Sequence, residues 1–208
     1  MSTFDWPLTA GFLPEQFSLD PEDRTLASES ILNGAVQTSG TPGKRFKCHM
    51  MLPSALPADR ADVEGFLAGL NGREHRVRLW HFTRPGIGGF GYPMGTINQT
   101  GVTVITGAAQ FATTLTLTGC GAGKTLKRGD FFSVNGQLLL NPATVTADGS
   151  GVMVLPAISR LRAAASAGQP VTLVRPFSTF VMDSNSYVSS HVPGANQPIG
   201  LDFTEVFT

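Results

Sequence analysis

Polar and apolar residues alternate along much of this chain, and one segment clearly departs from that alternation. Within residues 59–71 the apolar positions follow the i, i+3, i+4, i+7 spacing of one helix face: Val63, Phe66, Leu67 and Leu70. Asp59 is suited to cap the N-terminus, and Gly72 supplies a left-handed stop. The pattern therefore predicts one short helix over 59–71, whose single apolar face packs on a sheet.

Alternation with a period of two predicts strands in most of the remaining sequence. The predicted strands are 44–52, 76–81, 102–106, 113–118, 171–175, 177–182 and 199–207. Two turn sequences predict β-hairpins. The first is Val134–Gln137 within 131–140, and the second is Asp148–Gly151 between 143–147 and 152–155. A short helix over 159–167 is also compatible with the pattern.

Frequent chain breakers decide the expected fold class. The 208 residues include 24 Gly and 14 Pro, which leave little room for long helices and favour short strands joined by turns. We therefore expect a mainly β protein, with β-sandwich or barrel-like sheets and one short α-helix packed on a sheet. Residues 1–95 are predicted to form a β region that holds the helix. Residues 96–176 would form a barrel-like or sandwich region, and 177–208 would return to the N-terminal sheet.

The composition narrows the class of protein. Hydrophobic residues make up 41% and charged residues 14%, which argues against disorder and against a coiled coil. The formal net charge is zero, so specific nucleic-acid binding is not expected. There is no apolar run of about 18 residues and no signal-peptide pattern, so we expect no membrane segment and synthesis in a cytoplasm.

The neutral total hides an uneven distribution of charge. Residues 1–30 contain six acids and one base, whereas 75–129 contain six bases and no acid. One interpretation is two separate solvated faces. The other is charge complementarity between subunits, for which the candidate residues are Asp20, Glu22, Asp23, Arg76, Arg78, Lys127 and Arg128.

Residues 84–95 contain five Gly and two Pro, which predicts a long loop. Long loops without regular structure in compact domains are usually functional or mobile. We therefore predict an interaction loop with four candidate contact residues: Phe90, Tyr92, Pro93 and Met94.

The sequence contains segments that resemble catalytic or cofactor-binding motifs, but none has the spacing and the structural context that the corresponding chemistry requires. Gly121–Thr125 has the wrong spacing for a phosphate loop, and Gly86–Gly91 lacks the helix that a dinucleotide site needs. The four His and two Cys show no metal-ligand spacing. Asp130 is predicted to be a turn carboxylate that caps backbone N–H groups. We therefore expect no enzymatic activity, no cofactor and no metal site.

The order of several segments resembles a family of tail proteins from long-tailed, siphovirus-like double-stranded DNA bacteriophages. No single motif is specific, and the resemblance lies in the running order of Phe4–Pro7, Gly43–Phe46, Phe66–Gly72, Pro93–Gly95, Gly107–Gln110, Leu126–Asp130, Asp148–Gly151, Leu155–Arg160 and Asp202–Glu205. The chain departs from the family pattern at Arg128 and over 183–198.

The resemblance implies a structural virion protein, the distal tail subunit of a ring that is commonly a hexamer, with residues 1–95 as the ring-forming region. Its implied partners are other copies of itself, the tail tube protein, the tail tip or hub proteins and the tape measure protein. It would be assembled in the host cytoplasm and reside in the phage tail. Alternatives are another minor tail, tip or hub protein, and a receptor- or carbohydrate-binding module that stacks sugars on Trp80, Phe90 and Tyr92.

Overall fold

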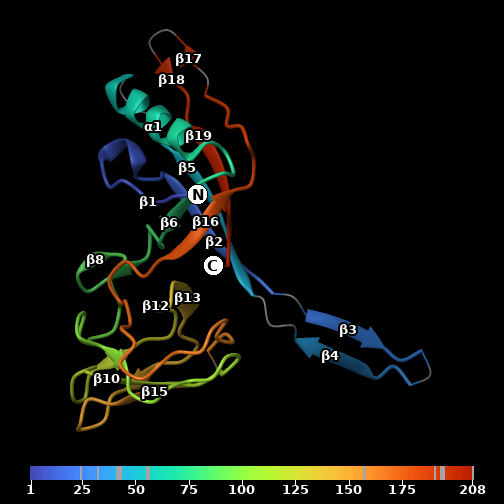
Figure 1. Cartoon of the computed structure of the whole chain (residues 1–208), viewed down its shortest axis with the longest axis vertical. Coiled ribbons are helices and arrows are strands. Elements are labelled where there is room, and N and C mark those ends of the chain that lie inside the picture. The colour runs from blue at the N-terminus through green and yellow to red at the C-terminus, as the bar shows by residue number, and fades with distance from the viewer. Residues whose placement is uncertain are drawn as a thin grey trace.

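The computed structural model describes the chain except for residues 24, 32, 41–43, 55–56, 157, 190, 193–194 and 208. The described part is 37% strand and 8% helix, which confirms the predicted mainly β class with one minor helix. Its strands form several separate sheets, none of which closes into a barrel (Figure 1).

The largest sheet has six strands in the order β1-β6-β16-β19-β5-β2 and draws on both ends of the chain. Only the β1–β6 pair is parallel. In sheet order the strands are Thr3–Asp5, Arg76–Leu79, Ser178–Met182, Ile199–Glu205, Arg45–Leu52 and Gln16–Glu22. Alternate residues of β5 and β19 are buried, so one face of the sheet is packed and the other faces water.

The helix α1 (Pro57–Leu70) confirms the predicted helix and covers the packed face of this sheet. Its predicted apolar face is buried at Val63, Leu67 and Leu70. The helix ends as expected, because Gly72 has a φ of 62°. Asp59 lies inside the first turn, two residues after the helix begins, and so it favours the positive end of the helix dipole without standing at the cap position.

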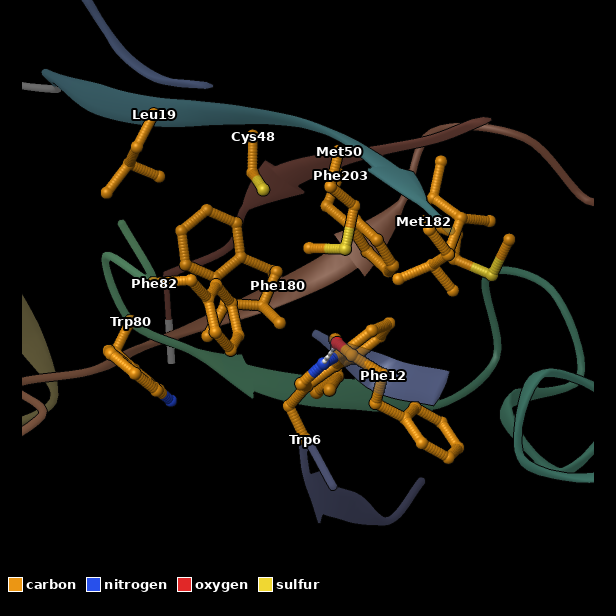
Figure 2. Close-up of a cluster of buried hydrophobic side chains, with 14 of the residues drawn as sticks. Trp6, Phe12, Leu19, Cys48, Met50, Trp80, Phe82, Phe180, Met182 and Phe203 are labelled. Atoms are coloured by element: carbon orange, nitrogen blue, oxygen red, sulfur yellow. Dashed lines mark hydrogen bonds between the residues drawn. The ribbon is translucent and has the colours of Figure 1, made fainter. Parts of the chain in front are cut away.

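The core of this first lobe, which we define as the six-stranded sheet with α1, is rich in aromatic residues. Figure 2 shows Trp6 and Phe12 from the N-terminal segment beside Phe180 and Phe203 from the central strands. The short 3-10 helix η1 (Ala10–Phe12) brings the Phe12 carbonyl to the indole N–H of Trp6, which donates a hydrogen bond to it at 2.9 Å. The N-terminal segment is therefore tied into the core.

The second lobe is built on a separate hydrophobic cluster, whose members run from Ile97 to Leu173. Its sheets are β15-β10-β9 and β11-β14, with the hairpin β12-β13 beside them. The strands are Thr103–Val104 (β9), Leu115–Thr118 (β10), Thr125–Leu126 (β11), Phe131–Val134 (β12), Gln137–Leu140 (β13), Val145–Thr146 (β14) and Met153–Leu155 (β15). Figure 1 shows this lobe below the large sheet.

The hairpin β12–β13 joins the two lobes, because both of its faces are buried. Phe131 and Leu138 belong to the cluster of the first lobe, whereas Phe132 and Leu139 belong to that of the second. The predicted turn is confirmed, with positive φ at Asn135 and at Gly136.

The second predicted hairpin is wrong, although its turn is present. The Asp148 carboxylate accepts hydrogen bonds from the backbone N–H groups of Ser150 and Val152, both at 2.9 Å. The strands on either side of the turn do not pair with each other: β14 pairs with β11, and β15 pairs with β10. Pairing of β15 with β10 places Leu155 beside Leu115 inside the second cluster, which burial favours.

Two other segments of the second lobe also differ from expectation. Residues 159–167 form no helix, because their backbone pairs with the segment 108–112 through bonds such as Phe111 N–H to the Leu161 carbonyl at 2.8 Å. Residues 171–175 form no continuous strand, and Thr172 makes only an isolated bridge to Ser133.

The remaining elements are three short hairpins. They are β3 (Thr25–Glu29) with β4 (Val36–Gly40), β7 (Pro85–Gly86) with β8 (Gly89–Phe90), and β17 (His191–Val192) with β18 (Ala195–Asn196). The β3–β4 hairpin stands away from both lobes (Figure 1).

Candidate interaction surfaces

The arm, defined as residues 25–40, is a two-stranded hairpin that stands away from both lobes (Figure 1). It continues the β2–β5 pair, whose register ends at Glu22 opposite Arg45. The β3–β4 pair of the arm then begins with Thr25 opposite Gly40. Every described side chain between 25 and 38 is exposed except Ser30, which is half-buried. Ile31 is fully exposed and Val36 is 60% exposed. The arm therefore offers apolar side chains to water or to a partner.

Local hydrogen bonds give the arm a defined tip. Ser30 N–H donates to the Ala35 carbonyl at 2.9 Å, and Gly34 N–H donates to the Ser30 carbonyl at 2.9 Å. The Asn33 side chain accepts a bond from Ala35 N–H at 3.0 Å. An isolated two-stranded hairpin is only marginally stable in water, because it has no third strand or helix to cover it. The surface of a neighbouring molecule would supply the covering layer that the arm lacks.

Ion pairs within the chain surround the base of the arm. Glu22 pairs with Arg45 and also with Lys47 at 3.1 Å, and these two cations lower the pKa of Glu22 to about 2. Asp23 pairs with Lys44 at 3.0 Å. Two of the predicted intersubunit acids are therefore already neutralised in one copy.

The other predicted intersubunit charges lie in different parts of the molecule. Arg78 pairs with Asp5 at 3.1 Å, and Asp20 accepts a hydrogen bond from Ser18 at 2.9 Å. Arg76 is half-buried, and its Nε is buried without a hydrogen-bond partner among the described residues. Lys127 and Arg128 are exposed on the second lobe. Contact of these residues with another copy stays a prediction.

The predicted interaction loop is a compact hairpin. A Cβ on Gly86 would lie 2.0 Å from the Tyr92 carbonyl oxygen, and a Cβ on Gly88 would lie 2.3 Å from the Tyr92 ring. The chain can pack this closely only because these positions lack side chains. Within the loop, Pro93 is buried, Tyr92 and Met94 are half-buried, and Phe90 is 61% exposed.

The exposed surface of this loop is limited to its tip. Ile87, which sequence reasoning did not select, is 63% exposed there beside Phe90. Trp80 is only 7% exposed, since Gly91 packs against it and the Arg175 guanidinium lies 5.4 Å from its ring centre. Trp80 therefore offers no open face on which a sugar could stack together with Phe90.

The carboxylate of Asp130 fastens this loop to the second lobe, which confirms its predicted role as a turn carboxylate. Asp130 is 1% exposed and accepts hydrogen bonds from the N–H groups of Met94 at 2.7 Å, Gly95 at 3.1 Å and Lys127 at 2.7 Å. Close by, the Arg84 guanidinium donates to the Gly129 carbonyl. All three donors are backbone groups, so the arrangement holds structure and presents no reactive group.

A pocket of about 260 Å³ lies where the two lobes meet. Phe111 and Phe207 line it and are 47% and 50% exposed, while Arg160 and Arg162 supply its positive charge. Of these two, Arg162 is paired with the buried Glu205 through an Nη1–Oε1 distance of 2.8 Å. Sequence reasoning missed this site, although Arg160 and Glu205 end two of the segments that carry the resemblance.

Two buried free cysteines lie elsewhere in the described part of the chain. Burial raises the pKa of Cys48, and it raises the pKa of Cys120 to about 11, so both remain thiols. Gly121–Thr125 lies in the turn region between β10 and β11, as expected, with Lys124 Nζ donating to Asn98 at 2.7 Å. Among the described residues no group of three or more His, Cys, Asp or Glu side chains is placed to hold a metal ion. No described helix is long and apolar enough to cross a membrane.

Comparison with known proteins adds no relative. A scan against models of protein families finds no match for this chain, and a search of curated proteins finds none either.

Proposed function

We propose that this chain is a self-assembling structural subunit of a phage tail, which forms the distal ring that joins the tail tube to the tip or baseplate. Its partners would be further copies of itself, the tube protein and the tip or hub proteins, with the tape measure protein as another neighbour. The protein would act in the virion by shape and contact.

The arm is the observation that carries this proposal. Of the 12 arm residues whose side-chain exposure is described, 11 are exposed, and none of the 12 belongs to either hydrophobic cluster. Ordering such a segment costs conformational entropy. Contacts between the arm and another subunit in an assembly would offset that cost.

The large sheet supports the same proposal. One of its two edge strands, β2, pairs with a described strand on one side only, and the arm extends directly from it. Pro21 in β2 is opposite Phe46, whose N–H donates instead to Glu205 of β19 at 2.8 Å. The backbone nitrogen of Pro21 therefore faces the free edge of β2. Because it carries no hydrogen, it offers no donor to a further strand, which disfavours uncontrolled strand pairing at this edge and leaves the arm available for contact.

The order of segments described above favours a phage tail over other self-assembling proteins. One of those segments ends at Arg160, which lines the pocket, and another ends at Glu205, which pairs with the pocket residue Arg162.

The test replaces residues 24–43 with Asn-Gly, so that a two-residue turn joins Asp23 to Lys44. This design extends the β2–β5 register by one pair, and none of the described residues that it removes belongs to either hydrophobic cluster. We expect the full chain to form rings visible by electron microscopy and by light scattering, and the armless variant to be a folded monomer. A full chain that stays monomeric at high concentration and binds no tail component would overturn the proposal.

A further inference from the structure

The pocket between the lobes has the size and lining of a site for protein side chains. At about 260 Å³ it is smaller than typical small-molecule sites of roughly 300–1,000 Å³. Its two exposed aromatic walls, Phe111 and Phe207, come from different lobes. Phe111 has a φ of 67°, an uncommon conformation for a bulky residue, and its N–H is held by the Leu161 carbonyl at 2.8 Å. The fold thus keeps a large apolar ring exposed at some cost in backbone strain.

The charge of the pocket is positive. Arg162 is already paired with Glu205, and its guanidinium lies 4.1 Å from the centre of the Phe207 ring. Arg160 is exposed and makes no ion pair within the described part of the chain. None of the described residues that line the pocket has an acidic side chain. An occupant that combines one carboxylate with an apolar side chain would therefore fit it.

The tip of the arm has this combination. Glu29 is the one charged residue among residues 25–40, and it is exposed two positions before the fully exposed Ile31. The arm stands away from the second lobe (Figure 1), so the tip does not reach the pocket of its own chain.

We propose that the arm of one copy inserts its tip into the pocket between the lobes of the next copy, with Ile31 between Phe111 and Phe207 and Glu29 facing Arg160. The occupant is a second copy of this chain, so the inference rests on the proposed function and specifies its contact. Because different surfaces meet, the contact is head-to-tail, and repetition around a rotation axis closes a ring.

The first test reverses the two charges in the full-length protein and measures self-association by sedimentation velocity. Glu29→Arg and Arg160→Glu should each weaken association by about tenfold or more, because each places like charges opposite one another. The double variant should recover to within about threefold of the original protein. Arg73→Glu, at an exposed turn far along the chain from both sites, is the matched control and should leave association unchanged.

The second test maps the contact by disulfide formation, for which the two native cysteines are suitably buried. Ile31→Cys combined with Ala163→Cys, at the pocket, should give cross-linked multimers under mild oxidation. Ile31→Cys combined with Ala122→Cys, at an exposed turn of the same lobe, should not. If removal of the arm abolishes assembly while the charge reversals and the pocket cysteine have no effect, this contact is overturned and the ring proposal stands. If the original protein never assembles, the proposed function itself is overturned, and this contact with it.

Discussion

Arg162 of the second lobe and Glu205 of the first sheet form a two-pronged ion pair. The guanidinium donates from Nη1 to Oε1 at 2.8 Å and from Nη2 to Oε2 at 2.5 Å. Glu205 is 2% exposed, and it also accepts bonds from Phe46 N–H at 2.8 Å and from the Ser178 hydroxyl. One carboxylate thereby connects three strands of the large sheet to the other lobe.

Removal of this carboxylate should destabilise the protein strongly. Glu205→Ala leaves the Arg162 charge half-buried without its partner and removes the acceptor of the Phe46 N–H. We expect the free energy of unfolding to fall by about 3–5 kcal/mol, as for other broken buried pairs. Urea denaturation followed by circular dichroism measures this change.

Two variants separate the effect of burial from that of charge. Asp5→Ala removes the exposed partner of Arg78 and should cost less than about 1 kcal/mol. The double variant Glu205→Leu, Arg162→Met replaces both charges by apolar groups and should cost less than Glu205→Ala alone. Equal losses for Glu205→Ala and Asp5→Ala would show that this pair does not hold the lobes together.

A second prediction concerns the close contact between Gly91 and Trp80. Gly91 has a φ of 79°, and a Cβ there would lie 2.5 Å from the Trp80 ring. Gly91→Ala should therefore lower stability by about 2–4 kcal/mol through backbone strain and overpacking. Gly65→Ala in α1, where the added Cβ meets open space, is the control and should raise stability by roughly 0.5–1 kcal/mol. Thermal melts of the two variants should shift in opposite directions.

The sequence predicts well those elements whose pattern is local. A few adjacent residues suffice to predict three elements, either by the spacing of apolar positions or by an Asn-Gly turn sequence: helix 57–70, strand 45–52 and the β12–β13 turn. The β2 strand is absent from the predicted strands. It contains Pro21, which a strand tolerates here because β2 lies at the edge of the sheet. The wrongly predicted hairpin at Asp148–Gly151 shows that local pattern does not decide strand pairing. Strand β15 pairs with β10 and not with β14, and this choice depends on residues distant in the sequence.

The interaction surfaces were harder to predict for a related reason. Sequence pattern gave little weight to residues 25–40, because this arm neither alternates into a core nor carries chemistry. Of the predicted loop residues, only Phe90 is widely exposed, since close packing around the glycines buries its neighbours. The pocket joins residue 111 to residue 207, a proximity that follows from the paths of two lobes and from no local signal.

The third prediction concerns Asp130, whose carboxylate satisfies three backbone N–H groups in a buried setting. Asp130→Ala leaves these donors unpaired and should cost about 3 kcal/mol or more. The matched control is Asp148→Ala, which removes an exposed turn carboxylate whose donors water can satisfy, and which should cost much less. Hydrogen exchange at the Met94 and Gly95 amides should accelerate in the first variant only. Unchanged protection there would contradict the assigned role.

The last prediction concerns the pH dependence of stability through His81. Burial between Phe17 and Phe131, together with the nearby Arg84 charge, lowers the pKa of His81 to about 4, and its Nδ1 accepts a hydrogen bond from the Arg84 N–H at 3.1 Å. The unfolded chain therefore takes up a proton near pH 6.5, before the folded chain does, so stability should fall as the pH drops from about 6.5 to 4. We expect a loss of about 1–2 kcal/mol after allowance for solvent screening at this partly exposed ring. His81→Asn keeps an acceptor for the Arg84 N–H and removes the titration, so its stability should decline less over this range in urea denaturation at each pH. Parallel pH profiles for the two proteins would show that His81 is not the group responsible.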